Sequence, residues 1–155
     1  GLPIIVHGDG TSLFTGTHAS DFAKGFVGLI GHQQAIGHAF HITSDESLTW
    51  DQIHIAIASA LNCEANSIHI PSDFIAQIDP DAKGSLLGDK AHSVIFDNTK
   101  IKQFVPDFCA TVPFSQGIKR TLDWFAEKPS RQIINPDTEQ LINHIISAYG
   151  HTNLK

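Results

Sequence analysis

Apolar residues recur along this chain with two different periods, which together predict a mixed α/β fold. Apolar positions three and four residues apart predict helices over about 18–30, 49–61, 114–125 and 138–149. Shorter helices are expected over 74–78 and from Asp97-Asn98 to Phe104, just before Pro106. Brief β-branched or alternating runs predict strands over 4–6, 39–43, 67–70 and 93–96. Short strands interleaved with helices indicate a small α/β lobe.

Length and composition fit one folded domain or one large lobe of a bigger enzyme. The chain has 155 residues, of which 41% are hydrophobic and 17% charged. No apolar run approaches the roughly 18 residues that span a bilayer, and no signal peptide is evident. Cys63 and Cys109 fit no metal or disulfide framework, so two reduced thiols and a cytoplasmic location are expected.

The net charge argues against nucleic-acid binding. The chain has 10 Lys and Arg and 16 Asp and Glu, so its net charge is −6. Proteins that bind the phosphate backbone usually present a basic face.

The start of the chain has an unusual composition. The chain contains no methionine, and a predicted strand begins only three residues after its first residue. We therefore expect a fragment of a longer polypeptide.

No complete catalytic or metal site is predicted. The ten histidines include no helical pair four residues apart with a nearby carboxylate, so no metal is expected. Gly8-Asp9-Gly10 reads as a turn, because a dinucleotide fingerprint needs a third glycine and an adjoining helix. Tyr149, the sole tyrosine, belongs to the apolar stripe of the last helix, so core packing is its expected role.

Several segments of the chain form an ordered set: Leu2 to Gly10 followed by Thr17 to Ala23, Gly37 to Thr43 with Leu48-Thr49-Trp50, Asp97 to Lys100, Val105-Pro106, and Phe114 to Ile118. Taken in this order, they resemble the C-terminal half of extended short-chain dehydrogenases/reductases, the NAD-dependent epimerase/dehydratase family. The resemblance ends near Phe125. It implies a lobe spanning 1–128 that binds substrate, with 129–155 as a helical extension of the same domain.

In this family the N-terminal Rossmann half binds NAD or NADP and supplies the catalytic tyrosine and lysine. The resemblance therefore implies a parent enzyme in which this chain would bind a small-molecule substrate and its own Rossmann half, without binding cofactor or membrane itself. Whether the chain alone is an enzyme is left open, because no Tyr-x-x-x-Lys motif is present.

Two departures from the family bear on the substrate. Its sugar-nucleotide members carry an arginine four residues after the second turn glycine, where this chain has Phe14. They carry another before a Gly-Asp pair, where Leu86 and Leu87 stand. A substrate other than a nucleoside-diphosphate sugar is expected, with Phe14, Thr17, His18 and Leu86 as its wall. Phe14 could instead fill the core, and His18 could simply cap a helix or lie on the surface.

Two other functions remain open at this stage. Some proteins on this scaffold bind RNA, and the segment Phe40–Thr43 would suit such a relative equally well. A free-standing interaction module is a weaker possibility, with the amphipathic C-terminal helices as its partner face.

Overall fold

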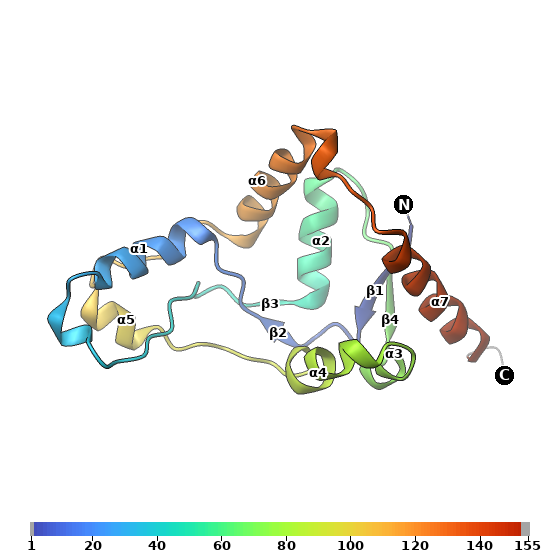
Figure 1. Ribbon diagram of the computed structural model, residues 1–155, viewed down its shortest axis with the longest axis horizontal. Coiled ribbons are helices and arrows are strands. Elements are labelled where there is room, and N and C mark those ends of the chain that lie inside the picture. Colours follow the sequence, from blue (N-terminus) through green and yellow to red (C-terminus); the bar gives the residue numbers. More distant parts are fainter. Residues whose placement is uncertain (1, 153–155) are drawn as a thin grey trace.

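The computed structural model describes residues 2–152, which form a mixed α/β arrangement (Figure 1). The strands are β1 (Ile4–His7), β2 (Leu13–Phe14), β3 (Leu48–Thr49) and β4 (Ser67–Ile70). The longer helices are α1 (Ala19–Leu29), α2 (Trp50–Ala60), α6 (Phe114–Ala126) and α7 (Pro136–Thr152). The shorter ones are η1 (Gln33–Ala35), α3 (Ser72–Ile78), η2 (Pro80–Ala82), α4 (Lys83–Ser85), the π-helical turn η3 (Leu86–Lys90), α5 (Thr99–Phe104) and η4 (Pro129–Arg131). The predicted fold class is confirmed, and every predicted helix is present within a few residues.

The hydrophobic core lies where β1 and β4 run parallel. The register pairs His7 with Ile70 at the ends of the two strands. Ile70 packs with Ile75 of α3, Leu86 of η3 and Ile145 of α7, and all four are buried. Tyr149 joins this cluster and meets Phe74 edge-on, with ring centroids 5.4 Å apart. We call β1, β4, α3, η3 and α7 the core end.

The opposite end consists of α1, residues 30–43 and α5, and we call it the α1 end. It buries Ile101 and Phe108, and polar contacts add to this packing. The carboxylate of Asp21 is fully buried and accepts hydrogen bonds from the backbone N–H groups of Thr111 (3.0 Å) and Val112 (2.8 Å). The ammonium of Lys24 lies 2.6 Å from the other carboxylate oxygen. Burial opposes ionisation of Asp21, but the hydrogen bonds from Lys24, Val112 and Thr111 outweigh it and lower its pKa to about 2.

A second polar clamp binds residues 43–45 to the start of α5. The buried amide of Asn98 accepts from the Thr43 backbone N–H (3.2 Å) and donates to the Thr43 carbonyl (2.8 Å). It also donates to Asp45 at 3.1 Å. The carboxylate of Asp45 meets Lys102 at 2.8 Å. The segment thus gains side-chain partners for its backbone in place of a strand ladder.

Two predicted strands are wrong. Residues 39–43 and 93–96 have no strand assignment in the described part of the chain. Side chains in the first still alternate: Phe40 packs edge-on against Phe104, with ring centroids 4.9 Å apart, while His41 faces Phe96. Alternate side chains of residues 39–43 thus point to opposite sides, as the sequence pattern predicts. A strand also needs a neighbouring strand to share its hydrogen bonds, and this segment has none among the described residues.

The chain exposes more surface than a compact protein of its mass. Its accessible area is 10170 Å², whereas a monomer of 16.9 kDa is expected to expose about 7,700 Å². Figure 1 shows the reason: the elements form an elongated, open frame rather than a sphere. Large apolar side chains are exposed on the α1 end, namely Phe22, Phe26, Val27, Ile30 and Ile36. Among the described residues, no helix is long and apolar enough to cross a membrane.

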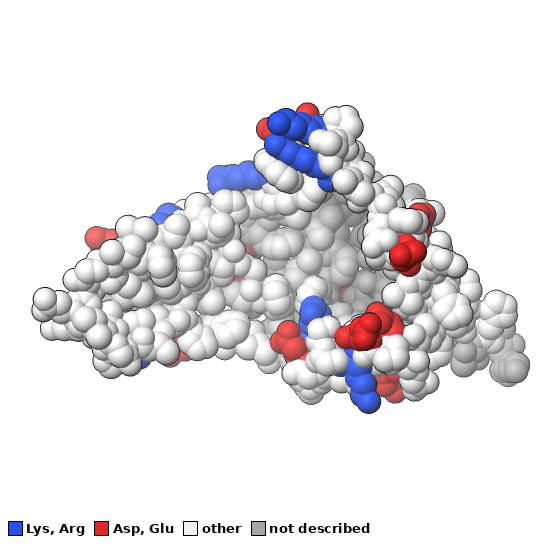
Figure 2. Space-filling model, in the orientation of Figure 1, with Lys and Arg blue, Asp and Glu red and all other residues white. Residues whose placement is uncertain are grey.

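Charged side chains are unevenly distributed over this frame. Figure 2 shows charged side chains gathered in two places: mainly Lys and Arg around α6 and η4, and a mixture of acidic and basic side chains around α4 and η3. The visible face between them is largely uncharged (Figure 2).

Candidate functional site

The strongest candidate site forms where β2, β3 and α2 meet. Antiparallel pairing sets Phe14 opposite Leu48, two residues before Trp50. Thr49 caps α2 through a reciprocal capping box with Gln52, which fixes where the helix begins. The Phe14 and Trp50 rings consequently lie side by side, with centroids 5.0 Å apart.

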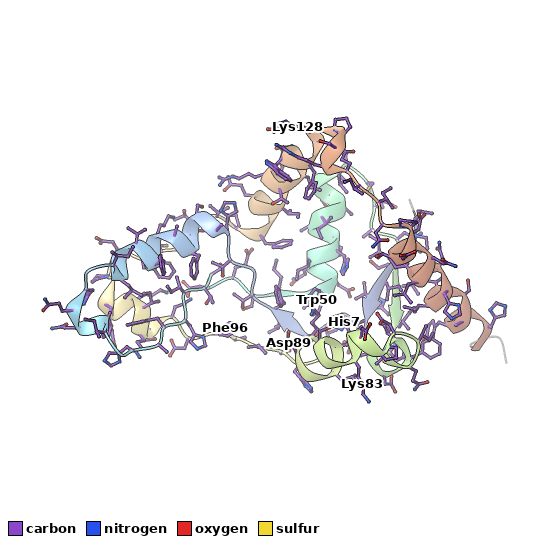
Figure 3. All side chains as sticks on the ribbon, in the orientation of Figure 1. His7, Trp50, Lys83, Asp89, Phe96 and Lys128 are labelled. Carbon is purple, nitrogen blue, oxygen red and sulfur yellow. The ribbon has the colours of Figure 1, made fainter. Side chains whose placement is uncertain are left out.

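The turn after β1 brings His7 against the same tryptophan. Gly8 and Gly10 adopt positive φ angles of 64° and 73°, which glycine tolerates at little cost. A Cβ on Gly10 would fall 2.5 Å from a carboxylate oxygen of Asp51, so this position requires glycine. The Gly10 carbonyl accepts from the Asp51 backbone N–H at 3.1 Å, which ties the turn to α2. His7 meets Trp50 edge-on at 4.9 Å (Figure 3).

The facing wall comes from η3 and the segment after it. A hydrogen bond from the Ala91 N–H to the Leu86 carbonyl (2.9 Å) closes the wider π-helical turn, a feature often found at functional sites. Ser12 donates to the Lys90 carbonyl at 2.7 Å, and the Val94 N–H donates to the Leu13 carbonyl at 3.2 Å. These bonds hold the wall against β2.

Together these elements enclose a cavity of about 300 Å³, which we call the aromatic cavity. Its lining residues are Leu13, Phe14, Thr15, Trp50, Asp89, Lys90, His92, Val94 and Phe96. The volume lies at the small end of the range for ligand pockets. Three aromatic rings and one acidic and one basic side chain make it the best-formed site for a small organic molecule.

Buried polar atoms beside the cavity have no protein partner. His7 is only 8% exposed, and within residues 2–152 neither of its ring nitrogens is hydrogen-bonded. The indole nitrogen of Trp50 is also buried and has no hydrogen-bond partner among the described residues. Such groups cost about 1–3 kcal/mol each when buried without a partner. Burial, together with Lys90 and His54, lowers the pKa of His7, which favours the neutral imidazole.

Lys90 is half-buried and supplies the cavity's basic group. Among the residues that line the cavity it is the only Lys or Arg. No ion pair involving its ammonium is present in the described part of the chain. Its charge is therefore available to a ligand.

A second hollow of about 290 Å³ lies between the start of α1 and α6. Thr17 and His18 line it from one side, and Phe114, Gly117 and other residues of α6 from the other. His18 is the N-cap of α1: its Nδ1 accepts from the Ser20 N–H at 3.2 Å. The Thr17 hydroxyl accepts from the Ser44 N–H at 2.9 Å. Both polar side chains are thus occupied in holding the fold.

The four residues expected to form one substrate wall occupy three places. Phe14 lines the aromatic cavity, whereas Thr17 and His18 line the second hollow. Leu86 is buried in the core cluster with Ile70 and lines neither of them. Contact of any of the four with substrate remains a prediction.

Sequence patterns did not identify His7, Trp50, Lys90 or Phe96 as site residues. Trp50 belongs to the apolar stripe of α2, which explains it as a packing residue. His7 directly precedes the Gly8-Asp9-Gly10 turn, which explains it as part of a loop. The available signal was that polar and aromatic residues end β1 and begin α2. Only the β2–β3 pairing shows that these positions meet.

The described residues do not form a dinucleotide cradle. After Gly10 the chain enters β2, and α1 begins only at Ala19. A dinucleotide fingerprint needs a helix that starts directly at the glycine turn, because its N-terminal N–H groups hold the pyrophosphate.

The fold of this chain is similar to part of several solved enzyme structures. The UDP-glucuronic acid 4-epimerase from Bacillus cereus, in complex with NAD, matches 81% of this chain and 34% of its own, with 17% identity and a TM-score of 0.61. The dTDP-glucose 4,6-dehydratase from Bacillus anthracis, in complex with NAD, matches 82% and 35%, with 16% identity and a TM-score of 0.60. RMD from Pseudomonas aeruginosa, complexed with NADPH, matches 81% and 37%, with 12% identity and a TM-score of 0.59.

The chain spans about a third of the length of these structures. No family model and no curated protein matches its sequence. At such low identity the similarity concerns the fold, and this agrees with the resemblance noted in the sequence. The chain therefore shares its fold with the C-terminal portion of these epimerase and dehydratase structures.

Proposed function

We propose that this chain is the substrate-binding portion of an NAD(P)-dependent epimerase, dehydratase or related oxidoreductase, and that the aromatic cavity contacts the substrate. The observation that carries the proposal is the match to the C-terminal portion of such enzymes, several of which were solved with NAD or NADPH. The cofactor and the catalytic acid/base group would reside on a Rossmann half that pairs with this chain.

The exposed apolar surface supports such a pairing. Phe22, Phe26 and Val27 lie on one helix and are all exposed. Exposed apolar patches of this kind usually mark an interface. Residues 38–43, which alternate like a strand but lack a partner strand among residues 2–152, border that helix. A Rossmann half could cover both features.

The test is the binding of NADH by the complete gene product that contains this chain. Titration followed by quenching of tryptophan fluorescence should give saturable binding, whereas the 155-residue chain alone should give none. Absence of NADH binding by the complete product would refute the oxidoreductase proposal.

We further propose that the substrate is not a nucleoside-diphosphate sugar. Phe14 stands where sugar-nucleotide members of the family carry an arginine, and it lines the aromatic cavity against Trp50. Lys90 is the one Lys or Arg among the residues that line this cavity, and Asp89 lines it too. One lysine beside an acidic group is poorly suited to a diphosphate.

The substitution Phe14→Arg tests this point. It should raise the affinity for UDP at least about tenfold, because a charge-assisted hydrogen bond contributes roughly 1.5–3 kcal/mol. Phe14→Leu is the matched control and should leave UDP binding unchanged. Isothermal titration calorimetry measures both. Tight binding of UDP by the unmodified chain, equal to that of the arginine variant, would contradict the proposal.

A further inference from the structure

We propose that the aromatic cavity recognises a small planar organic anion with a single negative charge: a hydroxy- or oxo-substituted arylcarboxylate. Its ring would lie against Phe14 and Trp50, and its carboxylate would pair with Lys90. This inference rests on the proposed function, because it names the substrate class of the same site.

The walls of the cavity suit an aromatic ring. The planes of Phe14 and Trp50 are tilted by 36° with centroids 5.0 Å apart, so they form one continuous apolar surface. Phe96 and Val94 add apolar contacts from the segment that follows η3. Offset or edge-on contacts between aromatic rings contribute about 0.5–1.5 kcal/mol beyond their buried area.

The charge of the cavity suits one negative group. Lys90 is half-buried and has no ion pair in the described chain, while Asp89 lines the same cavity. A carboxylate balances the single ammonium. A second negative charge on the ligand would be repelled by Asp89 at short range.

The polar atoms beside the cavity suit an oxygen substituent on the ring. The indole N–H of Trp50 is a donor only, and neutral His7 offers one donor and one acceptor. None of these atoms has a partner within residues 2–152, and solvent does not reach them. An oxygen substituent that reached the indole N–H would supply the partner that this buried donor lacks. Forming that bond would remove the cost of an unpartnered buried donor.

The size of the cavity agrees with a ligand of this class. About 300 Å³ holds the equivalent of roughly ten water molecules. A single substituted ring with a carboxylate fills such a space, whereas a nucleoside diphosphate with its sugar would extend well beyond it.

The experiment is a binding titration on the ¹⁵N-labelled 155-residue chain, followed by NMR. The chain has two tryptophans, Trp50 and Trp124, and the substitution Trp124→Phe assigns their indole N–H signals. The probes are 4-hydroxybenzoate, 4-hydroxycinnamate and indole-3-carboxylate. Their neutral counterpart is 4-hydroxybenzamide, and UDP represents the nucleotides.

At least one of the acids should shift the Trp50 indole signal in a saturable way. 4-Hydroxybenzamide should bind at least about tenfold more weakly than 4-hydroxybenzoate, since the loss of a charge-assisted contact costs roughly 1.5 kcal/mol or more. Lys90→Met should abolish the difference between acid and amide. Lys83→Met is the matched control, because Lys83 lies on α4 and is not among the lining residues (Figure 3).

Three results would overturn the proposal. They are the absence of any Trp50 shift with all three acids, equal binding of acid and amide, and tighter binding of UDP than of every acid. The titration contains no NAD(H), so it can fail while the complete gene product still binds NADH. A failure of this inference is thereby separated from a failure of the proposed function.

Discussion

The core end and the α1 end of this chain are stabilised by different interactions. At the core end, Ile70, Ile75 and Ile145 from β4, α3 and α7 bury one another. At the α1 end Phe22, Phe26 and Val27 of the helix are exposed. Two apolar side chains, Ile101 and Phe108, are buried there, and the second of them lies against Gly25 of α1. The buried polar groups Asp21 and Asn98 add hydrogen-bonded clamps that the described residues of the core end lack. An apolar cluster tolerates small shifts of its members, whereas hydrogen-bonded clamps require particular partners. The α1 end therefore depends on single side chains, while its exposed face remains available to a partner.

The largest expected effect concerns the core end. Ile70 is 0% exposed, so Ile70→Ala should lower the free energy of unfolding by about 2–5 kcal/mol through lost contacts and a residual cavity. Ile36 is 80% exposed, and Ile36→Ala should change it by less than about 0.5 kcal/mol. Urea denaturation followed by circular dichroism measures both. Similar losses from the two substitutions would mean that the chain has no distinct core end.

A smaller but localised effect is expected from Asp21→Asn. The amide can still accept from Thr111 and Val112, but it loses the charge that strengthens these bonds and the pair with Lys24, which should cost about 2 kcal/mol. Hydrogen exchange should speed up at the amides of residues 111 and 112 and along α1, and not in β4. Asp123→Asn, on the exposed side of α6, is the control and should leave exchange unchanged.

The same carboxylate predicts a pH dependence. Its folded pKa of about 2 lies below the ordinary value of 3.8, so the unfolded chain binds the proton more readily. The stabilisation by Asp21 is therefore complete above about pH 4 and is lost as the pH falls through 2. The asparagine variant should show a shallower loss of stability across this window in acid titrations. An unchanged slope would show that Asp21 does not act as an ionised clamp.

A small effect on stability is expected from Phe26→Ser on the exposed face of α1. Phe26 is 53% exposed and stacks on Phe22 with centroids 5.9 Å apart. The free energy of unfolding should change by less than about 1 kcal/mol, while self-association of the chain, measured by sedimentation velocity, should decrease because an apolar patch is reduced. A loss of stability comparable to that of Ile70→Ala would place this side chain in a core.

The sequence by itself determined the helices and the class of fold. The three- and four-residue spacing of apolar side chains fixes which face of α2, α6 or α7 is buried, and local signals fix the ends. Thr49 with Gln52 is such a signal, and the two residues form a capping box at the start of α2. These interactions connect residues close together in the chain, so they can be read without knowledge of the rest of the fold.

Only the tertiary structure decided where strands form and which side chains make a site. The alternation of Phe40 and Ile42 was visible in the sequence, but a strand also needs a partner, and the described residues supply none there. The aromatic cavity likewise brings together Phe14, Trp50 and Lys90, which lie 36 and 40 residues apart along the chain. Their proximity follows from strand pairing and helix packing, which depend on many weak contacts that no local pattern encodes.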